Sequence, residues 1–131
     1  MSEFDEFADE LIRIAPGLEP ALRARDEDVR PDPETPILWM GAAGSAVAKS
    51  MDTLDEETLH RIFDLAERHL ATGSQSLKNG VATGFLEALA SAVSSGRIDG
   101  PRLAGFLGPK SRAYLDAWDQ FTIGHSTLDP P

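Results

Sequence analysis

Apolar residues recur at helical spacing along most of the chain, and they are densest between Ser76 and Ser95. At 3.6 residues per turn they cover roughly half of a helix surface. Glu87 is the one charged residue between Lys78 and Arg97. A helix this apolar needs neighbours on more than one side, so we predict that it is the central helix of a helical domain. Its apolar positions are Leu77, Val81, Gly84, Phe85, Ala88, Leu89, Ala92 and Val93.

Two helices are predicted ahead of residue 26. Ser2 caps the first, and Asp5 completes a capping box three residues later. Pro16-Gly17 ends this helix, and a short second helix follows over residues 19–25. The positions that we expect to face inward are Phe4, Phe7, Ala8, Leu11 and Ile12 in the first helix, and Leu18 and Leu22 at the second.

A third helix is predicted from Pro36 to about Met51, with Thr35 as its cap. Two glycines lie on its apolar face. Because glycine inside a helix costs about 1 kcal/mol relative to alanine, close packing against another helix is the expected compensation. Leu38 and Trp39 point away from this face, and they either meet a second layer of the core or form an exposed anchor for a partner. The apolar face consists of Ile37, Met40, Gly41, Gly44, Val47, Ala48 and Met51.

A fourth helix carries clear signals at both ends. Asp55 is its predicted cap, and Leu54 and Leu59 can form a hydrophobic staple around that cap. Gly73 is the predicted left-handed residue that ends the helix. Because only a short connection leads from Gly73 into the central helix, we expect the two helices to form an antiparallel hairpin. The predicted buried stripe is Leu59, Ile62, Phe63, Ala66 and Leu70.

Two further helices are predicted after Gly96. A short one begins at Asp99 or Gly100, and the last runs from about residue 111 to 122. Residues 123–131 are expected to form a flexible tail. The short helix should turn Leu103, Phe106 and Leu107 inward. On the last helix, one face carries Tyr114, Ala117, Trp118 and Phe121, and the other carries Arg112, Asp116 and Asp119, with Arg112 and Asp116 placed to pair.

The pattern as a whole predicts an all-α fold, because no run of alternating apolar and polar residues suggests a strand. We expect a compact bundle of about six helices around a central antiparallel hairpin. That helix pair, residues 55–71 and 76–95, is similar to a HEAT-type hairpin, although no second copy follows at a fixed period. Residues 1–122 form one domain, in which 1–36 are an acidic N-terminal part and 37–122 the core.

Charge narrows the range of functions. The formal net charge is −10, and residues 1–36 contribute −7 of it. Such a molecule repels nucleic-acid phosphate and anionic lipid, so we expect no direct binding to nucleic acid or membranes. The acidic N-terminus does not resemble a signal peptide, and no apolar run is long enough to span a bilayer, which predicts a cytoplasmic location. Cysteine is absent, which excludes disulfides and thiolate chemistry.

Two groups of acidic residues are candidates for partner binding. One lies in the proline-rich loop over residues 26–36 and lacks the glycine and the spacing of a calcium-binding loop. The other falls within a narrow stripe of the fourth helix, where carboxylates can receive a partner rich in arginine or lysine. Both groups have a simpler interpretation as solvated surface. With Trp39, the candidate residues are Asp26, Glu27, Asp28, Asp32 and Glu34, and Glu57, His60, Asp64 and Glu67.

The catalytic patterns that we tested do not hold. The segment around Lys49 lacks the glycine that a phosphate-binding loop needs before its lysine. Glu57 and His60 have the spacing of half a carboxylate-bridged metal site, but no second Glu-x-x-His follows. Glu87 is either a partly exposed acid on a polar face or a polar contact to another helix or a partner. We therefore predict a protein that is not an enzyme and that needs no metal or cofactor.

The C-terminal half resembles a family of small, uncharacterised bacterial proteins with a domain of unknown function. The resemblance covers roughly residues 55–122. It rests on the segment Gly84-Phe85-Leu86-Glu87-Ala88-Leu89 and on the run from Phe106 to Phe121, FLGPKSRAYLDAWDQF. Small acidic members of this kind look like immunity proteins that neutralise a toxin, so the resemblance implies a similar role here.

Charge and resemblance together lead to two hypotheses. In the first, the chain is a non-catalytic acidic inhibitor of immunity type, which blocks the basic substrate channel of a toxin such as a nuclease. In the second, it is a helical adaptor that docks a partner through apolar residues such as Leu38 and Trp39. Affinity falls as salt rises in the first case and is insensitive to salt in the second.

Overall fold

The computed structural model describes residues 2–25, 31, 35–122 and 124–129, and every regular element within these ranges is a helix. The predicted all-α fold is therefore confirmed. In chain order the elements are α1 (Glu3–Ile14), η1 (Pro16–Leu18), α2 (Glu19–Arg25), α3 (Pro36–Ser50), α4 (Glu56–Thr72), α5 (Gln75–Asn79), η2 (Gly80–Leu86), α6 (Glu87–Ser94), α7 (Gly100–Ala104) and α8 (Pro109–Thr122). α5, η2 and α6 follow one another without a break and together make the central helix.

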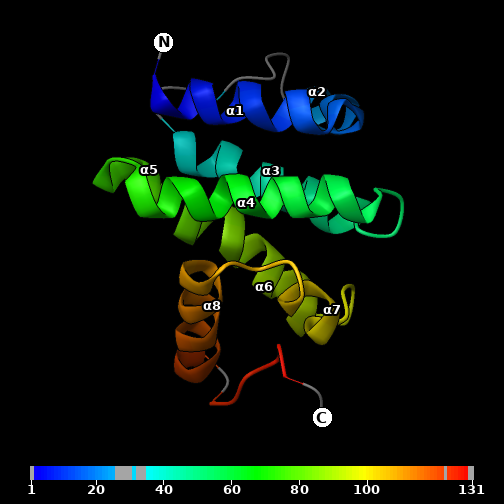
Figure 1. The fold of residues 1–131 in the computed structure, drawn as a ribbon, viewed down its shortest axis with the longest axis vertical. Helices are drawn as coiled ribbons and strands as arrows, with labels where there is room; N and C mark the ends of the chain where they lie inside the picture. Colours follow the sequence, from blue (N-terminus) through cyan, green and yellow to red (C-terminus); the bar gives the residue numbers. More distant parts are fainter. Residues whose placement is uncertain (1, 26–30, 32–34, 123, 130–131) are drawn as a thin grey trace.

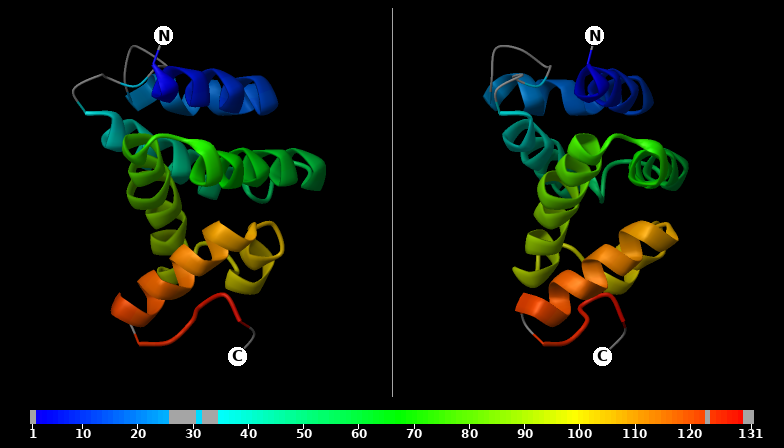
Figure 2. Two further views of the ribbon diagram at one scale, coloured as in Figure 1. Left: turned by 60° about the vertical axis from the view of Figure 1, so that its left-hand side comes forward. Right: turned by 90° about the vertical axis from the view of Figure 1, so that its left-hand side faces the viewer.

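The helices are stacked along the long axis of the molecule (Figure 1). α1 and α2 lie at one end, α3 and α4 occupy the middle, and α7, α8 and the C-terminal segment lie at the other end. The central helix runs from the middle toward the far end, as the turned views also show (Figure 2). It packs along α3 on one side and contacts α8 on another. The central position predicted for this helix is confirmed.

The predicted caps Ser2 and Asp55 form, whereas Thr35 precedes α3 without a side-chain hydrogen bond to it. The hydroxyl of Ser2 accepts the backbone N–H of Asp5 at 3.1 Å, and the Asp5 carboxylate accepts the N–H of Ser2 at 3.4 Å. Asp55 accepts the N–H of Thr58 at 2.7 Å and caps α4. The hydrogen bonding from Thr58 lowers the pKa of Asp55, because it favours the charged form of that carboxyl group.

Gly73 differs from the prediction. Its φ of −71° and ψ of 167° are extended, so it is not a left-handed cap. An added Cβ there would lie 2.6 Å from the carbonyl oxygen of His69 and 3.1 Å from Cδ2 of Leu77. The close return of the chain against the end of α4, rather than a positive φ, is therefore what the missing side chain permits.

α3 and the central helix approach each other closely at two glycines. At Gly44, an added Cβ would overlap the carbonyl oxygen of Phe85 and lie 2.9 Å from Cβ of Ala88. At Gly84, it would lie 2.6 Å from Cβ of Met40. Neither position admits a larger residue unless the helices separate. The close packing that the glycines of the third helix predict is confirmed.

The central helix is not a regular α-helix throughout. Its middle portion, η2, is π-helical, and the backbone N–H of Glu87 reaches the carbonyl oxygen of Ala82 five residues back. Side chains therefore drift around the helix axis, and Gly80, Ala82 and Leu86 are buried in addition to the predicted apolar face. A sequence pattern read at 3.6 residues per turn does not predict this π-helical segment.

The predicted antiparallel hairpin does not form. Ser74 caps α5 by accepting the N–H of Leu77 at 3.2 Å, so the connection from α4 is as short as expected. The central helix nevertheless crosses α4 steeply instead of lying along it (Figures 1 and 2). α4 contacts α5 and η2, whereas α6 packs against α3 and α8. Close packing at the glycines draws the central helix toward α3 and away from α4.

α8 turns a face inward that differs in part from the one predicted. Its buried residues are Ser111, Leu115 and Asp119, whereas Phe121 is 91 % exposed. Asp119, expected on the outer face, is 1 % exposed. The face predicted from the aromatic residues is right in part: Tyr114 and Trp118 are half-buried against the core, whereas Ala117 and Phe121 are exposed. Hydrogen bonds from other segments accompany the burial of Ser111 and Asp119.

The C-terminal segment supplies some of those hydrogen bonds. The backbone N–H and the hydroxyl of Thr127 both donate to Oδ2 of Asp119 at 2.8 Å. Arg112 pairs with Asp116 at 3.0 Å, as predicted, and also with Asp129 at 2.6 Å. Leu128 is buried in the core. Residues 124–129 are thus fastened to α8, in contrast to the flexible tail expected from the sequence.

Substitution of Gly44 by alanine tests the close approach. We expect Gly44→Ala to lower the free energy of unfolding by about 1–2 kcal/mol. Overpacking against backbone belongs to the upper part of the usual range, about 2–3 kcal/mol, and helix propensity returns about 1 kcal/mol. Urea denaturation followed by circular dichroism measures this difference. Gly17→Ala is the control, since nothing lies within 4 Å of its added Cβ. A Gly44→Ala protein as stable as the parent would contradict the packing described here.

Candidate functional site

A groove runs alongside the contact between α3 and the central helix. It encloses about 370 Å³, and its floor is made of small residues because the two helices approach at glycine and alanine. Serine and threonine side chains line its edges, and Arg97 is its one charged residue. We call this surface the α3 groove. It is lined by Ile37, Leu38, Gly41, Ala42, Ser45, Thr83, Gly84, Ala88, Ser91 and Arg97.

Two aliphatic side chains stand exposed at the rim of the α3 groove. Leu38 is 65 % exposed and Ile37 is 47 % exposed. Both lie in the first turn of α3, which follows directly from the Pro36 start signal. Ile37 was expected on the buried face of this helix. The backbone of its turn does lie against Gly84 of the central helix, but the Ile37 side chain stays partly exposed.

The two candidate anchors on α3 have different environments. Trp39 is 7 % exposed and belongs to the hydrophobic core, which corrects its assignment as a partner-binding residue. Leu38 is the exposed member of the pair. Adjacent residues of a helix point about 100° apart, so one of them can face the core while the other faces solvent. The choice left open by the sequence is therefore decided separately for each residue.

The structure describes only part of the predicted acidic surface. Asp26, Glu27, Asp28, Asp32 and Glu34 lie outside the described residues. On α4, Glu57 and Asp64 are exposed, and His60 is exposed with its ring 4.7 Å from that of Phe106. Whether these residues meet a partner stays a prediction.

Glu67 is committed to the fold, which corrects its assignment to a binding stripe. Its carboxylate accepts the backbone N–H groups of Lys110 and Ser111 at 3.0 and 2.9 Å, and the Ser111 hydroxyl at 3.0 Å. These N–H groups belong to the first turn of α8, where no intrahelical partner exists and negative charge is favourable. Glu67 therefore caps α8 from α4.

Glu87 makes the polar contact to a neighbouring helix that was one of its two interpretations. Nε1 of Trp118 donates to Oε1 of Glu87 at 2.7 Å, which ties the central helix to α8. Burial raises the pKa of the neighbouring Tyr114, and the charge of Glu87 raises it further. Glu87 is half-buried, so both of its sequence interpretations hold in part.

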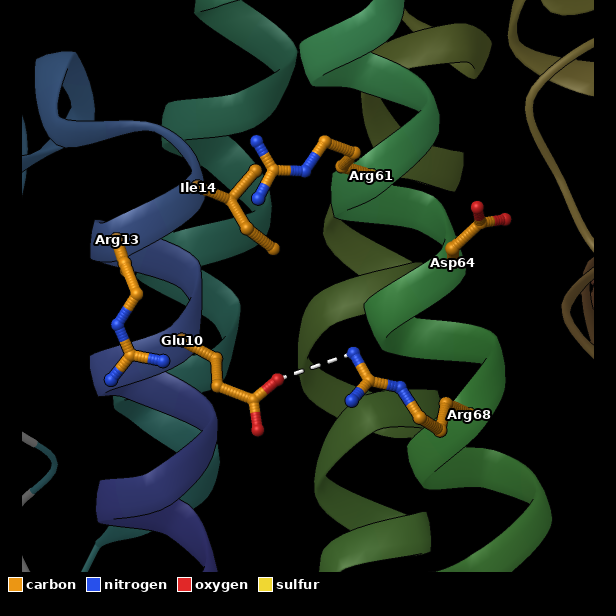
Figure 3. A pocket seen from close by; sticks show the side chains of 6 residues that line it. All are labelled: Glu10, Arg13, Ile14, Arg61, Asp64 and Arg68. Atoms are coloured by element: carbon orange, nitrogen blue, oxygen red, sulfur yellow. Dashed lines mark hydrogen bonds and ion pairs between the residues drawn. The ribbon is translucent and has the colours of Figure 1, made fainter.

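A second groove lies between α1 and α4 (Figure 3). It encloses about 230 Å³ and is lined by Glu10, Arg13, Ile14, Arg61, Asp64 and Arg68. Arg68 pairs with Glu10 across the groove at 3.2 Å. We call this surface the arginine groove. The sequence indicates neither groove, because each is formed by helices that are distant along the chain.

Comparison with known proteins places the chain in a family. A family model described as a domain of unknown function (DUF7674) matches residues 8–123. The chain belongs to this family. The match extends the resemblance noted for residues 55–122 through most of α1. No curated protein and no solved structure matches the chain.

Two further properties of this DUF7674 member bear on its chemistry. Among the described residues, no group of three or more histidine or acidic side chains is placed to hold a metal ion. Within the same residues, no helix has both the length and the apolar character needed to cross a membrane.

His69 is a half-buried titratable group, and its burial changes its pKa. Its ring packs edge-on against Phe7 at 5.5 Å, and its Nε2 is buried without a hydrogen-bond partner. Burial lowers the pKa of His69 below its ordinary value, and the nearby carboxylates of Glu3, Glu6 and Glu10 only partly oppose this. The folded protein therefore favours neutral His69.

Removal of the Glu67 cap tests its structural role. We expect Glu67→Ala to lower the free energy of unfolding by about 2 kcal/mol, because first-turn N–H groups and a buried hydroxyl lose their acceptor. Asp64→Ala, three residues earlier on the same helix and exposed, should change it by less than about 0.5 kcal/mol. Chemical denaturation of both variants measures the difference. Equal stability of the two variants would refute the cap.

The lowered pKa of His69 predicts a pH-dependent stability. Both states are neutral at this residue above about pH 7.5, one unit above the ordinary pKa of histidine. As pH falls below that value the unfolded chain takes up a proton first, so the free energy of unfolding should fall until the pH passes the folded pKa. His69→Gln should flatten this slope between about pH 7.5 and about pH 5.5 in urea titrations. The difference should persist in high salt, because burial causes it; an identical slope in both proteins would contradict it.

Proposed function

We propose that this protein is a non-catalytic binding protein whose partner docks in the α3 groove. The exposure of Ile37 and Leu38 at the rim of that groove carries the proposal. Burying an aliphatic side chain fully contributes about 1.5–3 kcal/mol, so two adjacent anchors supply the kind of apolar centre that dominates many interfaces. The small residues of the floor give an incoming side chain access to the backbone of both helices.

The groove is suited to an apolar segment with few charges. Its lining holds a single charge, Arg97, and otherwise apolar, serine and threonine side chains. An amphipathic helix presents apolar residues at positions i, i+3, i+4 and i+7, which matches a groove between two helices. A carboxylate at one end of such a helix would pair with Arg97. This is the adaptor hypothesis, with Leu38 retained as an anchor and Trp39 removed from it.

A second candidate function follows from the net charge of −10. In this case the chain is an immunity-type inhibitor that blocks the basic channel of a toxin by charge complementarity and steric exclusion. Exposed Glu57 and Asp64 on α4 support it. The described part of the chain also uses several acids internally, among them Glu67, Asp119 and the capping Asp55, so less free acidic surface is available than the composition implies.

Binding to the product of a neighbouring gene tests the proposal. We expect Leu38→Ser to weaken the complex at least about tenfold, because it removes an apolar anchor. Phe121→Ser is the matched control, since Phe121 is the most exposed large apolar residue that the structure describes and lies on α8, outside the groove. It should change the dissociation constant less than about twofold. Calorimetric titration of the purified proteins measures all three constants.

Salt distinguishes the two candidates in the same experiment. Docking in the α3 groove should change little between about 50 and about 500 mM NaCl, whereas an acidic inhibitor should lose affinity steeply. Co-expression should protect cells from a toxic neighbour only in the second case. A complex that Leu38→Ser leaves intact would exclude the α3 groove as its docking site.

A further inference from the structure

The C-terminal segment, residues 124–129, turns back from the end of α8 toward α7 (Figures 1 and 2). Gly124 makes the turn with a left-handed φ of 79°, and its backbone N–H donates to the carbonyl oxygen of Asp119 at 3.0 Å. The returning backbone passes close to Gly100, where an added Cβ would overlap the carbonyl oxygen of Thr127. A turn at a single glycine therefore places the whole segment against α7 and α8.

Three successive residues of this segment meet matching groups of the fold. The backbone N–H and the hydroxyl of Thr127 donate to Oδ2 of Asp119, both at 2.8 Å. Leu128 is 2 % exposed and belongs to the hydrophobic core. Asp129 accepts a hydrogen bond from the guanidinium group of Arg112 at 2.6 Å. Proteins recognise short peptides by combining backbone hydrogen bonds with pockets for individual side chains, so the segment is bound as a peptide ligand would be.

The contacts of the segment do not all favour this arrangement. Burial of Leu128 favours it. The ion pair between Arg112 and Asp129 is partly exposed to water and contributes little. Asp119 is 1 % exposed, and among the described residues no donor reaches its Oδ1. Because a buried polar atom without a hydrogen bond costs free energy, hydration of Asp119 would offset part of the loss when the segment leaves.

A groove of about 600 Å³ lies beside the segment. Val93, Ile98 and Pro101 form its apolar side, and residues of the C-terminal segment form the other side. The volume falls within the range of ligand pockets, about 300–1,000 Å³. An incoming chain can therefore lie next to the segment before it replaces it. This groove shares no lining residue with the α3 groove, so a ligand here does not depend on docking there.

We propose that Asp119, Arg112 and the pocket of Leu128 form a peptide-binding site, which a partner protein fills with a segment of the pattern Ser/Thr–aliphatic–Asp. The chain's own residues 127–129 have this pattern and occupy the site until the partner displaces them. The partner's hydroxyl residue binds Asp119, its aliphatic residue replaces Leu128, and its acid pairs with Arg112.

The tether of the C-terminal segment selects the kind of partner. A segment of the same chain acts at an effective concentration on the order of millimolar. A second copy of the chain offers only the identical segment and does not compete at lower concentration. A partner that also contacts the apolar side of the neighbouring groove, formed by Val93, Ile98 and Pro101, gains affinity that the chain's own segment lacks.

Calorimetric titration of the full chain with a free peptide tests the site. The probe is acetyl-Gly-His-Ser-Thr-Leu-Asp-amide, which has the sequence of residues 124–129. The parent protein should bind it with a dissociation constant on the order of millimolar or weaker, because its own segment competes. Two control peptides carry valine in place of threonine or serine in place of leucine.

Variants of the segment should open the site to the peptide. Leu128→Ser removes the apolar anchor of the segment but leaves the pocket intact, so the probe should bind at least about tenfold more tightly than to the parent. Asp129→Asn removes only a surface ion pair and should tighten binding about two- to threefold. Circular dichroism checks that both are folded, and if Leu128→Ser is not, Asp129→Asn decides the question.

Second substitutions in the opened protein test the pocket. Asp119→Ala should weaken binding of the probe at least about tenfold, because both donors of its threonine lose their acceptor. Gln120→Ala, the adjacent and exposed position of α8, is the matched control and should change binding less than about twofold. Both control peptides should bind the opened protein at least about tenfold more weakly than the probe.

Amide hydrogen exchange distinguishes displacement of the segment from binding beside it. When the probe saturates the site, the N–H groups of Thr127 and Leu128 should lose their protection, because the segment has left. Tighter binding to an opened variant together with this loss supports the proposal.

Four results would overturn the proposal. The first is no binding of the probe to either opened variant at concentrations on the order of millimolar. The second is equal binding of the valine peptide, and the third is a protected Thr127 at saturation. The fourth is a dimer of the parent at micromolar concentration in sedimentation experiments, because the site would then serve a second copy.

Discussion

The close approach of α3 to the central helix determines most of the remaining geometry. Gly44 lies against the backbone of Phe85, and Gly84 lies against Met40. Because backbone contacts leave no space for rearranged side chains, this crossing fixes the direction of the central helix. α4 must then cross that helix instead of lying along it, and α8 packs on the remaining side. The α3 groove lies along the open side of the same contact, and Gly84 belongs to both.

Several acidic side chains form hydrogen bonds that hold parts of the fold together. Glu67 caps α8, Asp119 holds the C-terminal segment, and Glu87 holds Trp118. The contacts of Glu67 and Glu87 join segments that are distant in the sequence, and the contact of Asp119 holds the segment that follows its own helix. All three satisfy N–H or hydroxyl donors that would otherwise lose water without replacement. Acidic composition therefore reflects the construction of the fold as well as its surface. A net charge of −10 overstates the number of carboxylates that are free to meet a basic partner.

The two grooves differ in the chemistry they offer. The α3 groove presents Ile37 and Leu38 above a floor of small residues, which suits apolar docking. The arginine groove presents Arg61 beside Ile14, with Arg13 beside Glu10 and Arg68 paired with Glu10. Neither groove requires catalysis by the protein, in keeping with the proposed binding role.

The sequence by itself determined the features that depend on neighbours three or four residues apart. These include the caps at Ser2 and Asp55, the buried stripe of α4 and the Arg112–Asp116 pair, because helical geometry alone brings such residues together. Glycine on α3 also indicated a close contact, though not its partner. Tertiary structure decided which face of α8 is buried, where Glu67 binds, how the C-terminal segment is held and where the grooves lie. Those features depend on contacts between residues far apart in the chain, and apolar spacing on one helix carries no information about the hydrogen-bond donors and acceptors that another segment will bring to it.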